Sequence, residues 1–229
     1  YDESLVISSA VQLVGACPSL TTIRSTERSL TTATVEFTGS ASGISNVTIT
    51  GPRPGVWLWD TRAQTTIQGV VIAEAEYVGM TSSDGNATVI LEDVLIRDTL
   101  TSPDDGSGYG WGMEVFDAIN LELRGVTLES NQDVGLYASG AGANISAEEL
   151  TILRTKANPV SQSGGWGIGL MTQATMTVSG AYLYQNRAMG VVIEEAGSSL
   201  IAEDIVIRET YEDASDQSWG RAFSVRDAA

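Results

Sequence analysis

Residues 203–210, EDIVIRET, repeat a pattern that occurs twice earlier in the chain, as EDVLIRDT at residues 92–99 and as EELTILRT at residues 148–155. The three copies begin at residues 92, 148 and 203, which places them 56 and 55 positions apart. Self-similarity at a fixed period of this length indicates a repeat protein, in which each unit packs against its neighbours.

Other landmarks return with the same period. Asn131 and Asn186 lie 55 positions apart, and each is followed four positions later by a glycine. We expect these asparagines at corners of the chain, because asparagine tolerates left-handed backbone and its amide can bond a neighbouring unit. A tryptophan followed by glycine also recurs, at Trp111, Trp166 and Trp219.

The apolar residues of each unit favour short strands. They alternate with other residues, as at Ile205 and Ile207, and the stretches between glycines are too short and too β-branched for helical repeats. A propeller would need tight hairpins, and Asp84-Gly85 is the one clear hairpin dipeptide. Each unit of about 55 residues divides into two turns of the chain plus a loop insertion. The predicted fold is therefore all-β, a parallel β-helix (solenoid) of about seven to eight coils.

The Asn-x-x-x-Gly-hydrophobic corners at residues 131–136 and 186–191, with the Ile/Leu-Arg-(x)-Thr strand ends, resemble right-handed parallel β-helix repeat proteins. The resemblance covers about residues 55–229. The chain is similar to a large secreted or cell-envelope group of predatory soil bacteria, whose function is mostly unassigned. The wider superfamily includes pectate lyases, pectin-hydrolysing glycosidases, tailspikes and adhesins. The Asn-Thr-Asp, Gly-His-Gly and Arg-Ile-Lys motifs of the hydrolases do not occur here, and no local pattern marks the calcium-binding acids of the lyases.

The two ends bear on the domain organisation. Residues 1–54 fit the repeat poorly, as is typical of a terminal capping unit, and residues 55–229 are expected to form the repeats of a single solenoid domain. The chain begins at Tyr1 and stops within a further unit, so we expect a piece of a longer protein. A solenoid cut within a repeat has unpaired strand edges, which predicts end-to-end or edge association.

Composition excludes several classes of function. The chain has no histidine, which removes Ser-His triads and imidazole metal sites, and Cys17 is alone, so no internal disulfide forms. Its net charge of −17 repels the phosphate backbone and excludes a nucleic-acid partner. No apolar run is long enough to span a membrane. We expect a secreted, periplasmic or cell-surface protein.

The loop insertions at residues 100–109, 156–164 and 211–218 leave the predicted coils at the same place. Stacked coils would display them in a row along one edge, about 10 Å apart. The three tryptophans would form a ladder at the base of these loops. A ladder facing outward makes a sugar-stacking platform, whereas buried packing is the more common role of tryptophan. The candidate carbohydrate-binding residues are Trp111, Trp166, Trp219, Tyr109 and Tyr211.

The same loops carry acids that suit a hard cation. Calcium is the candidate cofactor, with Asp104, Asp105, Asp213 and Asp216 as candidate ligands, although no calcium-loop motif occurs and solvated loop residues are the simpler interpretation. No catalytic residue is predicted. The favoured function is a non-enzymatic display, adhesion or carbohydrate-binding protein whose partner is a polysaccharide or cell-surface glycan. The alternatives are a polysaccharide lyase or other carbohydrate-active enzyme, and a purely structural rod or spacer.

Overall fold

The computed structural model describes residues 1–39, 41–61, 63–83, 85, 87–103, 106–117, 119–218 and 220–227. These residues form an all-β protein in which every named strand pairs in parallel with its neighbours, and none of them is helical. No part of the described chain therefore offers a helix able to cross a membrane. The expected all-β class with parallel strands in a repeat-like arrangement is confirmed.

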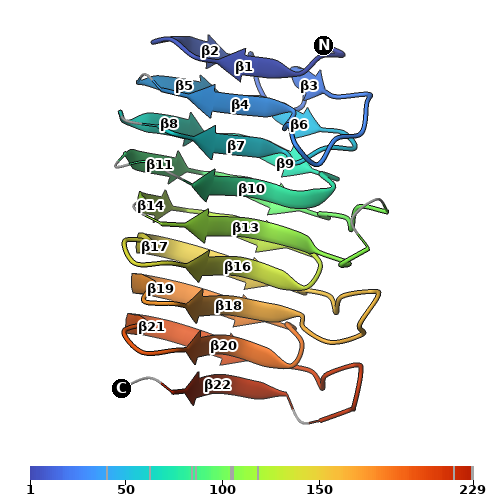
Figure 1. Ribbon diagram of the computed structural model, residues 1–229, viewed down its shortest axis with the longest axis vertical. Coiled ribbons are helices and arrows are strands. Elements are labelled where there is room, and N and C mark those ends of the chain that lie inside the picture. Colours follow the sequence, from blue (N-terminus) through green and yellow to red (C-terminus); the bar gives the residue numbers. More distant parts are fainter. Residues whose placement is uncertain are drawn as a thin grey trace.

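The nine-stranded sheet keeps its strands in the order of the sequence, so the chain returns to this sheet once per layer (Figure 1). Its strands are β1 (Leu5–Ile7), β4 (Val35–Thr38), β7 (Val56–Trp59), β10 (Tyr77–Ser83), β13 (Gly110–Phe116), β16 (Val134–Ser139), β18 (Trp166–Met171), β20 (Met189–Glu194) and β22 (Arg221–Arg226).

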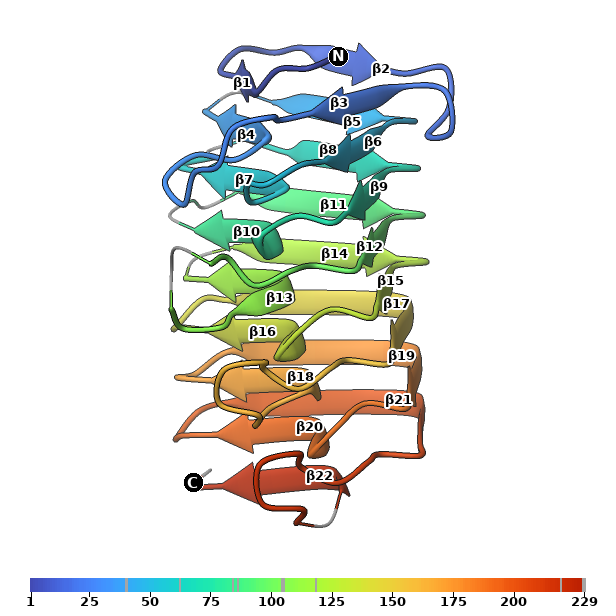
Figure 2. The ribbon, with the colours of Figure 1, turned by 90° about the vertical axis from the view of Figure 1, so that its right-hand side faces the viewer.

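The second sheet has 13 strands, and its earlier layers form two columns of strands that meet at the long strand β17, from which β19 and β21 continue the sheet (Figure 2). Each of its earlier layers contributes two short strands, whereas each of its last three layers contributes one strand of ten residues. The strands are β2 (Gln12–Val14), β3 (Thr22–Arg24), β5 (Ser42–Ser45), β6 (Thr48–Thr50), β8 (Thr65–Gln68), β9 (Val71–Ala73), β11 (Thr88–Glu92), β12 (Leu95–Arg97), β14 (Asn120–Arg124), β15 (Thr127–Glu129), β17 (Asn144–Leu153), β19 (Thr175–Tyr184) and β21 (Ser199–Arg208).

A layer here is one strand of the nine-stranded sheet with the strand or strands that follow it in the other sheet. The register between layers reproduces the repeat of the sequence. Met113 pairs with Leu136 and Leu136 pairs with Ile168, so residues 113 and 168, which are 55 positions apart, lie two layers apart. The copies of the EDIVIRET pattern obey the same rule, because Glu148 and Glu203 both pair with Ser179 of the layer between them.

The core lies between the two sheets. Alternate side chains of each strand point inward, as β13 shows with its buried Met113 and Val115, and they pack against buried residues of the facing sheet such as Leu128 and Ile152. Burial of these aliphatic side chains is the main favourable term in folding, at roughly 25 cal/mol per Å² of apolar surface. Period-2 alternation in the sequence thus has its cause in one buried and one outer face.

The corner asparagines join successive layers. Asn131 accepts hydrogen bonds from the amide and hydroxyl of Thr99 at 3.1 and 2.8 Å and donates to the carbonyl of Ile96. Asn186 makes the equivalent bonds to Thr155 and Ile152. The predicted amide bond to a neighbouring unit is confirmed. The expected left-handed backbone is wrong for both asparagines, because the preceding residues Ser130 and Gln185 take that conformation, each with φ of 57°.

The long loops leave the layers at one edge. Three connections link the 13-stranded sheet to β13, β18 and β22, and their described residues, 98–103, 106–109, 154–165, 209–218 and 220, project on the same side of the molecule (Figure 1). Short connections serve the layers between them. Residues 25–34, which the repeat pattern did not mark, form another long connection at this edge, between β3 and β4.

Candidate functional site

The outer face of the nine-stranded sheet carries a row of side chains in register. Trp57 pairs with Thr81, Thr81 pairs with Glu114, and Glu114 pairs with Tyr137. These residues alternate with inward-facing Leu58, Ser82 and Val115, all at most 1% exposed, so the row points away from the core. Trp57 and Tyr137, which are 80 positions apart in the sequence, thereby lie in one row that crosses four layers.

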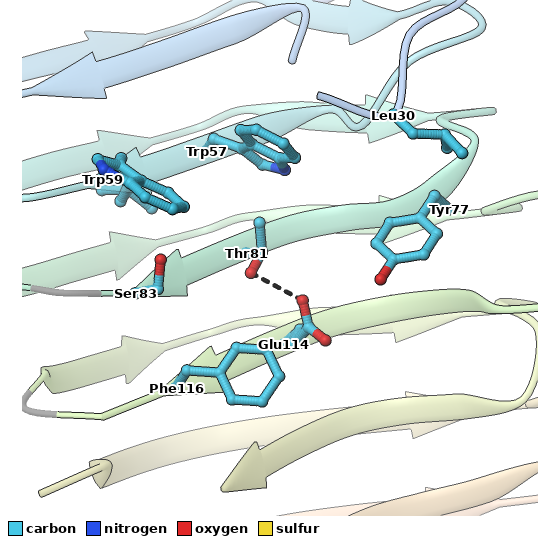
Figure 3. Close-up of a pocket in the computed structure, with 9 residues that line it drawn as sticks. Leu30, Trp57, Trp59, Tyr77, Thr81, Ser83, Glu114 and Phe116 are labelled. Atoms are coloured by element: carbon cyan, nitrogen blue, oxygen red, sulfur yellow. Dashed lines mark hydrogen bonds between the residues drawn. The ribbon is translucent and has the colours of Figure 1, made fainter. Parts of the chain in front are cut away.

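A groove with a volume of about 330 Å³ lies over this row. Figure 3 shows Trp57 and Trp59 on one side of the groove, Phe116 on the other, and Thr81 and Glu114 between them. We call it the aromatic groove; it is lined by Leu30, Trp57, Leu58, Trp59, Tyr77, Thr81, Ser83, Glu114 and Phe116. Apolar walls around a small number of polar groups are typical of small-molecule and sugar sites.

Glu114 is the carboxyl group of this lining. It is 5% exposed, and the hydroxyl of Thr81 donates a hydrogen bond of 2.9 Å to its Oε2. Burial raises the pKa of Glu114 from 4.5 to about 7, and the bond from Thr81 offsets this shift only in part. A substantial fraction of the Glu114 side chains is therefore protonated at neutral pH.

Aromatic rings continue beyond the groove. The Tyr109 ring lies 6.2 Å from that of Tyr77 and 4.6 Å from that of Trp111, and Trp111 stacks on Tyr137 at 4.7 Å. Tyr137 also meets Phe116 edge to face at 6.2 Å. We call these rings the aromatic strip: Tyr77, Tyr109, Trp111, Phe116 and Tyr137. The strip and the groove form one surface on the outer face of the sheet.

Trp111 is held in place by a partly buried carboxylate. Its indole Nε1 donates a 2.8 Å hydrogen bond to Oδ2 of Asp133. Burial raises the pKa of Asp133, while its bonds from Trp111 and Asn158 work in the opposite direction. A ring anchored at its N–H keeps one orientation, which fixes the packing of Tyr109 and Tyr137 against it.

The predicted tryptophans occupy an intermediate position between core and solvent. Trp111 and Trp166 are both half-buried. A Cβ placed on Gly169, which pairs with Tyr137, would lie 3.4 Å from Cδ2 of Tyr137 and 3.5 Å from Cε3 of Trp166. Both rings therefore flank Gly169 on the outer face. Trp219 lies outside the described residues.

The two tyrosines predicted to bind carbohydrate lie in different parts of the structure. Tyr109 belongs to the aromatic strip. Tyr211 lies in the loop before β22, 44% exposed, with the guanidinium carbon of Arg187 5.9 Å above its ring. The structure thus brings Tyr109, Trp111 and Trp166 together near Tyr137 and leaves Tyr211 apart.

The predicted calcium ligands do not gather within the described chain. Oδ1 of Asp213 accepts from the amide and hydroxyl of Ser215, and Oδ1 of Asp216 accepts from the amide of Ser218, so each supports its own turn. Asp104 and Asp105 lie outside the described residues. Across the part of the chain that the structure describes, no group of three acidic or cysteine side chains is placed to hold a metal ion.

Sequence reasoning missed most of the groove and part of the strip: Trp57, Trp59, Tyr77, Thr81, Glu114, Phe116 and Tyr137. A signal was present, because Trp57-Leu58-Trp59 and Glu114-Val115-Phe116 each place one inward aliphatic residue between two outward ones. These outward residues do not recur in later units, so a search for repeats passes over them.

The chain was compared with known proteins in three ways. No family model, no curated protein and no solved structure matches it.

Proposed function

We propose that the protein is a right-handed parallel β-helix that a bacterium secretes or displays on its cell surface. We further propose that its aromatic groove binds a neutral polysaccharide chain. The parallel pairing of the named strands and the sequence order of the nine-stranded sheet support the fold. The single observation that carries the function is the aromatic groove itself, with its continuation in the aromatic strip.

The geometry suits a sugar chain lying along the stack of layers. Successive strands lie about 4.8 Å apart, so the row from Trp57 to Tyr137 extends roughly 14 Å. Rings at both ends of this row offer apolar faces to the C–H faces of sugar rings, and Thr81 and Glu114 between them offer hydrogen-bonding groups to hydroxyls.

Charge favours a neutral glycan over a uronate polymer. The chain carries a net charge of −17, and the described residues that line the groove include Glu114 but no arginine or lysine. An anionic polymer would meet repulsion without a cation to pair with its carboxylates.

Binding is favoured over cleavage. Hydrolysis of a glycosidic bond commonly uses two carboxyl groups about 5–9.5 Å apart. Glu36, the other carboxylate of the same outward row, is three strand spacings from Glu114, roughly 14 Å. A lyase would need a basic side chain beside the sugar, and the described lining supplies none.

A binding measurement tests the proposal. Isothermal titration with cellohexaose, chitohexaose and xylohexaose should detect binding to the native chain, and Trp57→Ala should weaken it about tenfold, or about 1.4 kcal/mol. Tyr182→Ala is the matched control, because Tyr182 is an exposed ring on the 13-stranded sheet, stacked on Tyr184. Equal affinities for both variants, or no binding of any neutral glycan, would contradict the proposal.

A further inference from the structure

Glu114 lines the aromatic groove beside Thr81. In the outward row Thr81 precedes it and Tyr137 follows it, so aromatic rings lie along the stack on both sides: Trp57 two layers before and Tyr137 one layer after. Figure 3 shows its carboxyl group on the groove floor, with the hydroxyl end of Tyr77 directed toward the same space. A sugar stacked on these rings would lie directly over this carboxyl group.

The hydrogen-bonding state of the carboxyl group leaves one oxygen for a ligand. Thr81 uses Oε2, and Oε1 makes no hydrogen bond to another residue of the described chain. A protonated carboxyl group placed here donates one hydrogen bond, whereas an ionised one can only accept.

We propose that Glu114 binds the glycan by donating its carboxyl proton to an acceptor oxygen of a sugar, so that glycan binding weakens as the pH rises above neutrality. This inference rests on the proposed function, which it deepens by naming the group that recognises the ligand. The ligand class is a neutral glycan that presents a hydroxyl, ring or acetamido oxygen over the floor of the groove.

Burial supports this direction of the pH effect. Burial raises the pKa of Glu114 to about 7 in the free protein. A sugar stacked over the carboxyl group removes further water from it, which disfavours the ionised form again. The glycan therefore binds the protonated form of Glu114 more tightly than the ionised form. Above the pKa of Glu114 in the free protein, binding requires uptake of a proton, so the dissociation constant of the glycan rises by up to tenfold per pH unit.

Other ionisable groups face this region. Tyr77 comes from β10, Tyr109 from the loop before β13 and Tyr137 from β16, and burial raises the pKa of Tyr137, so it stays neutral at and above neutral pH. Three other carboxylates lie along this surface: Glu36 on β4, which pairs with Trp57; Asp133, which accepts from Trp111; and Glu195 after β20, whose charge acts on Tyr137. The loop that carries Leu30 also holds Arg28, which is paired with Glu76. A variant of Glu114 itself is needed to separate its proton from these groups.

The test measures the affinity of chitohexaose and cellohexaose from pH 5.5 to pH 8.5 for the native chain and for Glu114→Gln. Gln keeps one donor and one acceptor at every pH, so its dissociation constants should stay flat while those of the native chain rise at least tenfold. Circular dichroism of both proteins at both pH limits confirms that the fold is intact.

Two outcomes would overturn the inference in distinguishable ways. Native affinities that are flat or increase with pH, or a Glu114→Gln variant that follows the native pH profile, would remove the role of the Glu114 proton and leave glycan binding standing. Absence of binding of either glycan to the native chain at every pH would remove the proposed function, and the inference with it.

Discussion

A column of glycines sets the width of the gap between the sheets. Gly135 occupies one position of this column, where a Cβ would lie 2.7 Å from the carbonyl oxygen of Gly167 and 2.7 Å from Cγ2 of Ile152 in the facing sheet. Contacts this short require the backbone to move. The column runs through six consecutive layers as Gly55, Gly79, Gly112, Gly135, Gly167 and Gly190.

Gly135→Ala should therefore lower the free energy of unfolding by about 1–3 kcal/mol, as overpacking of a tight core does. Gly169→Ala is the control, because a Cβ there has no neighbour closer than 3.4 Å and should change stability by less than about 0.5 kcal/mol. Urea unfolding followed by circular dichroism measures both values. Equal stability of the two variants would show that the column does not limit the sheet spacing.

The long loops act as structural elements because they pack against one another. Asn158, 3% exposed, donates a 3.0 Å hydrogen bond to the carbonyl of Ser107 in the loop of an earlier layer. Its Oδ1 accepts from the amides of Val160 and Ser161 within its own loop. One side chain thus connects the loop before β13, which carries Tyr109, to the loop before β18.

Asn158→Ala should loosen both loops while the sheets stay folded. Loss of a buried polar group with several partners costs about 1–3 kcal/mol, which raises the equilibrium constant for local opening of the loops by roughly tenfold or more. Limited proteolysis and amide exchange at residues 100–109 and 156–165 report this opening. Ser161→Ala serves as the control, since its exposed hydroxyl bonds only Ser163 among the described residues. Unchanged protection in Asn158→Ala would mean that the loops are held by other contacts.

At the scale of the whole molecule, stability depends on neighbours along the stack. Ile168 and Leu170 of β18 are fully buried between adjacent layers. The equivalent inward side chains of β22, Phe223 and Val225, are 46% and 60% exposed, because that strand has a partner on one side within the described chain. Each layer gains its burial from the layers that flank it.

Amide exchange should accordingly be slowest in β10 to β18 and fastest in β22. Hydrogen-exchange mass spectrometry of the native chain measures this gradient, with exchange in the central strands approaching the rate set by global unfolding. Uniform protection from the middle of the stack to β22 would contradict a stack stabilised layer by layer.

The sequence by itself was enough to predict short strands, a parallel repeat of about 55 residues and a common edge from which the loops leave. The physical reason is that inward residues of each layer pack on their equivalents in the next, so the same apolar and asparagine positions must recur. Asn131 and Asn186, both buried between layers, became visible for this reason.

The groove, by contrast, is formed only in the tertiary structure. Outward side chains such as Trp57, Glu114 and Tyr137 meet no equivalent requirement and do not recur, so no period marks them. Strand register alone aligns them across the layers, and the same register buries Glu114 between rings, which shifts its pKa. Recurrence in a sequence reports what the core requires; the chemistry of the outer face arises where unrelated residues are stacked into neighbours.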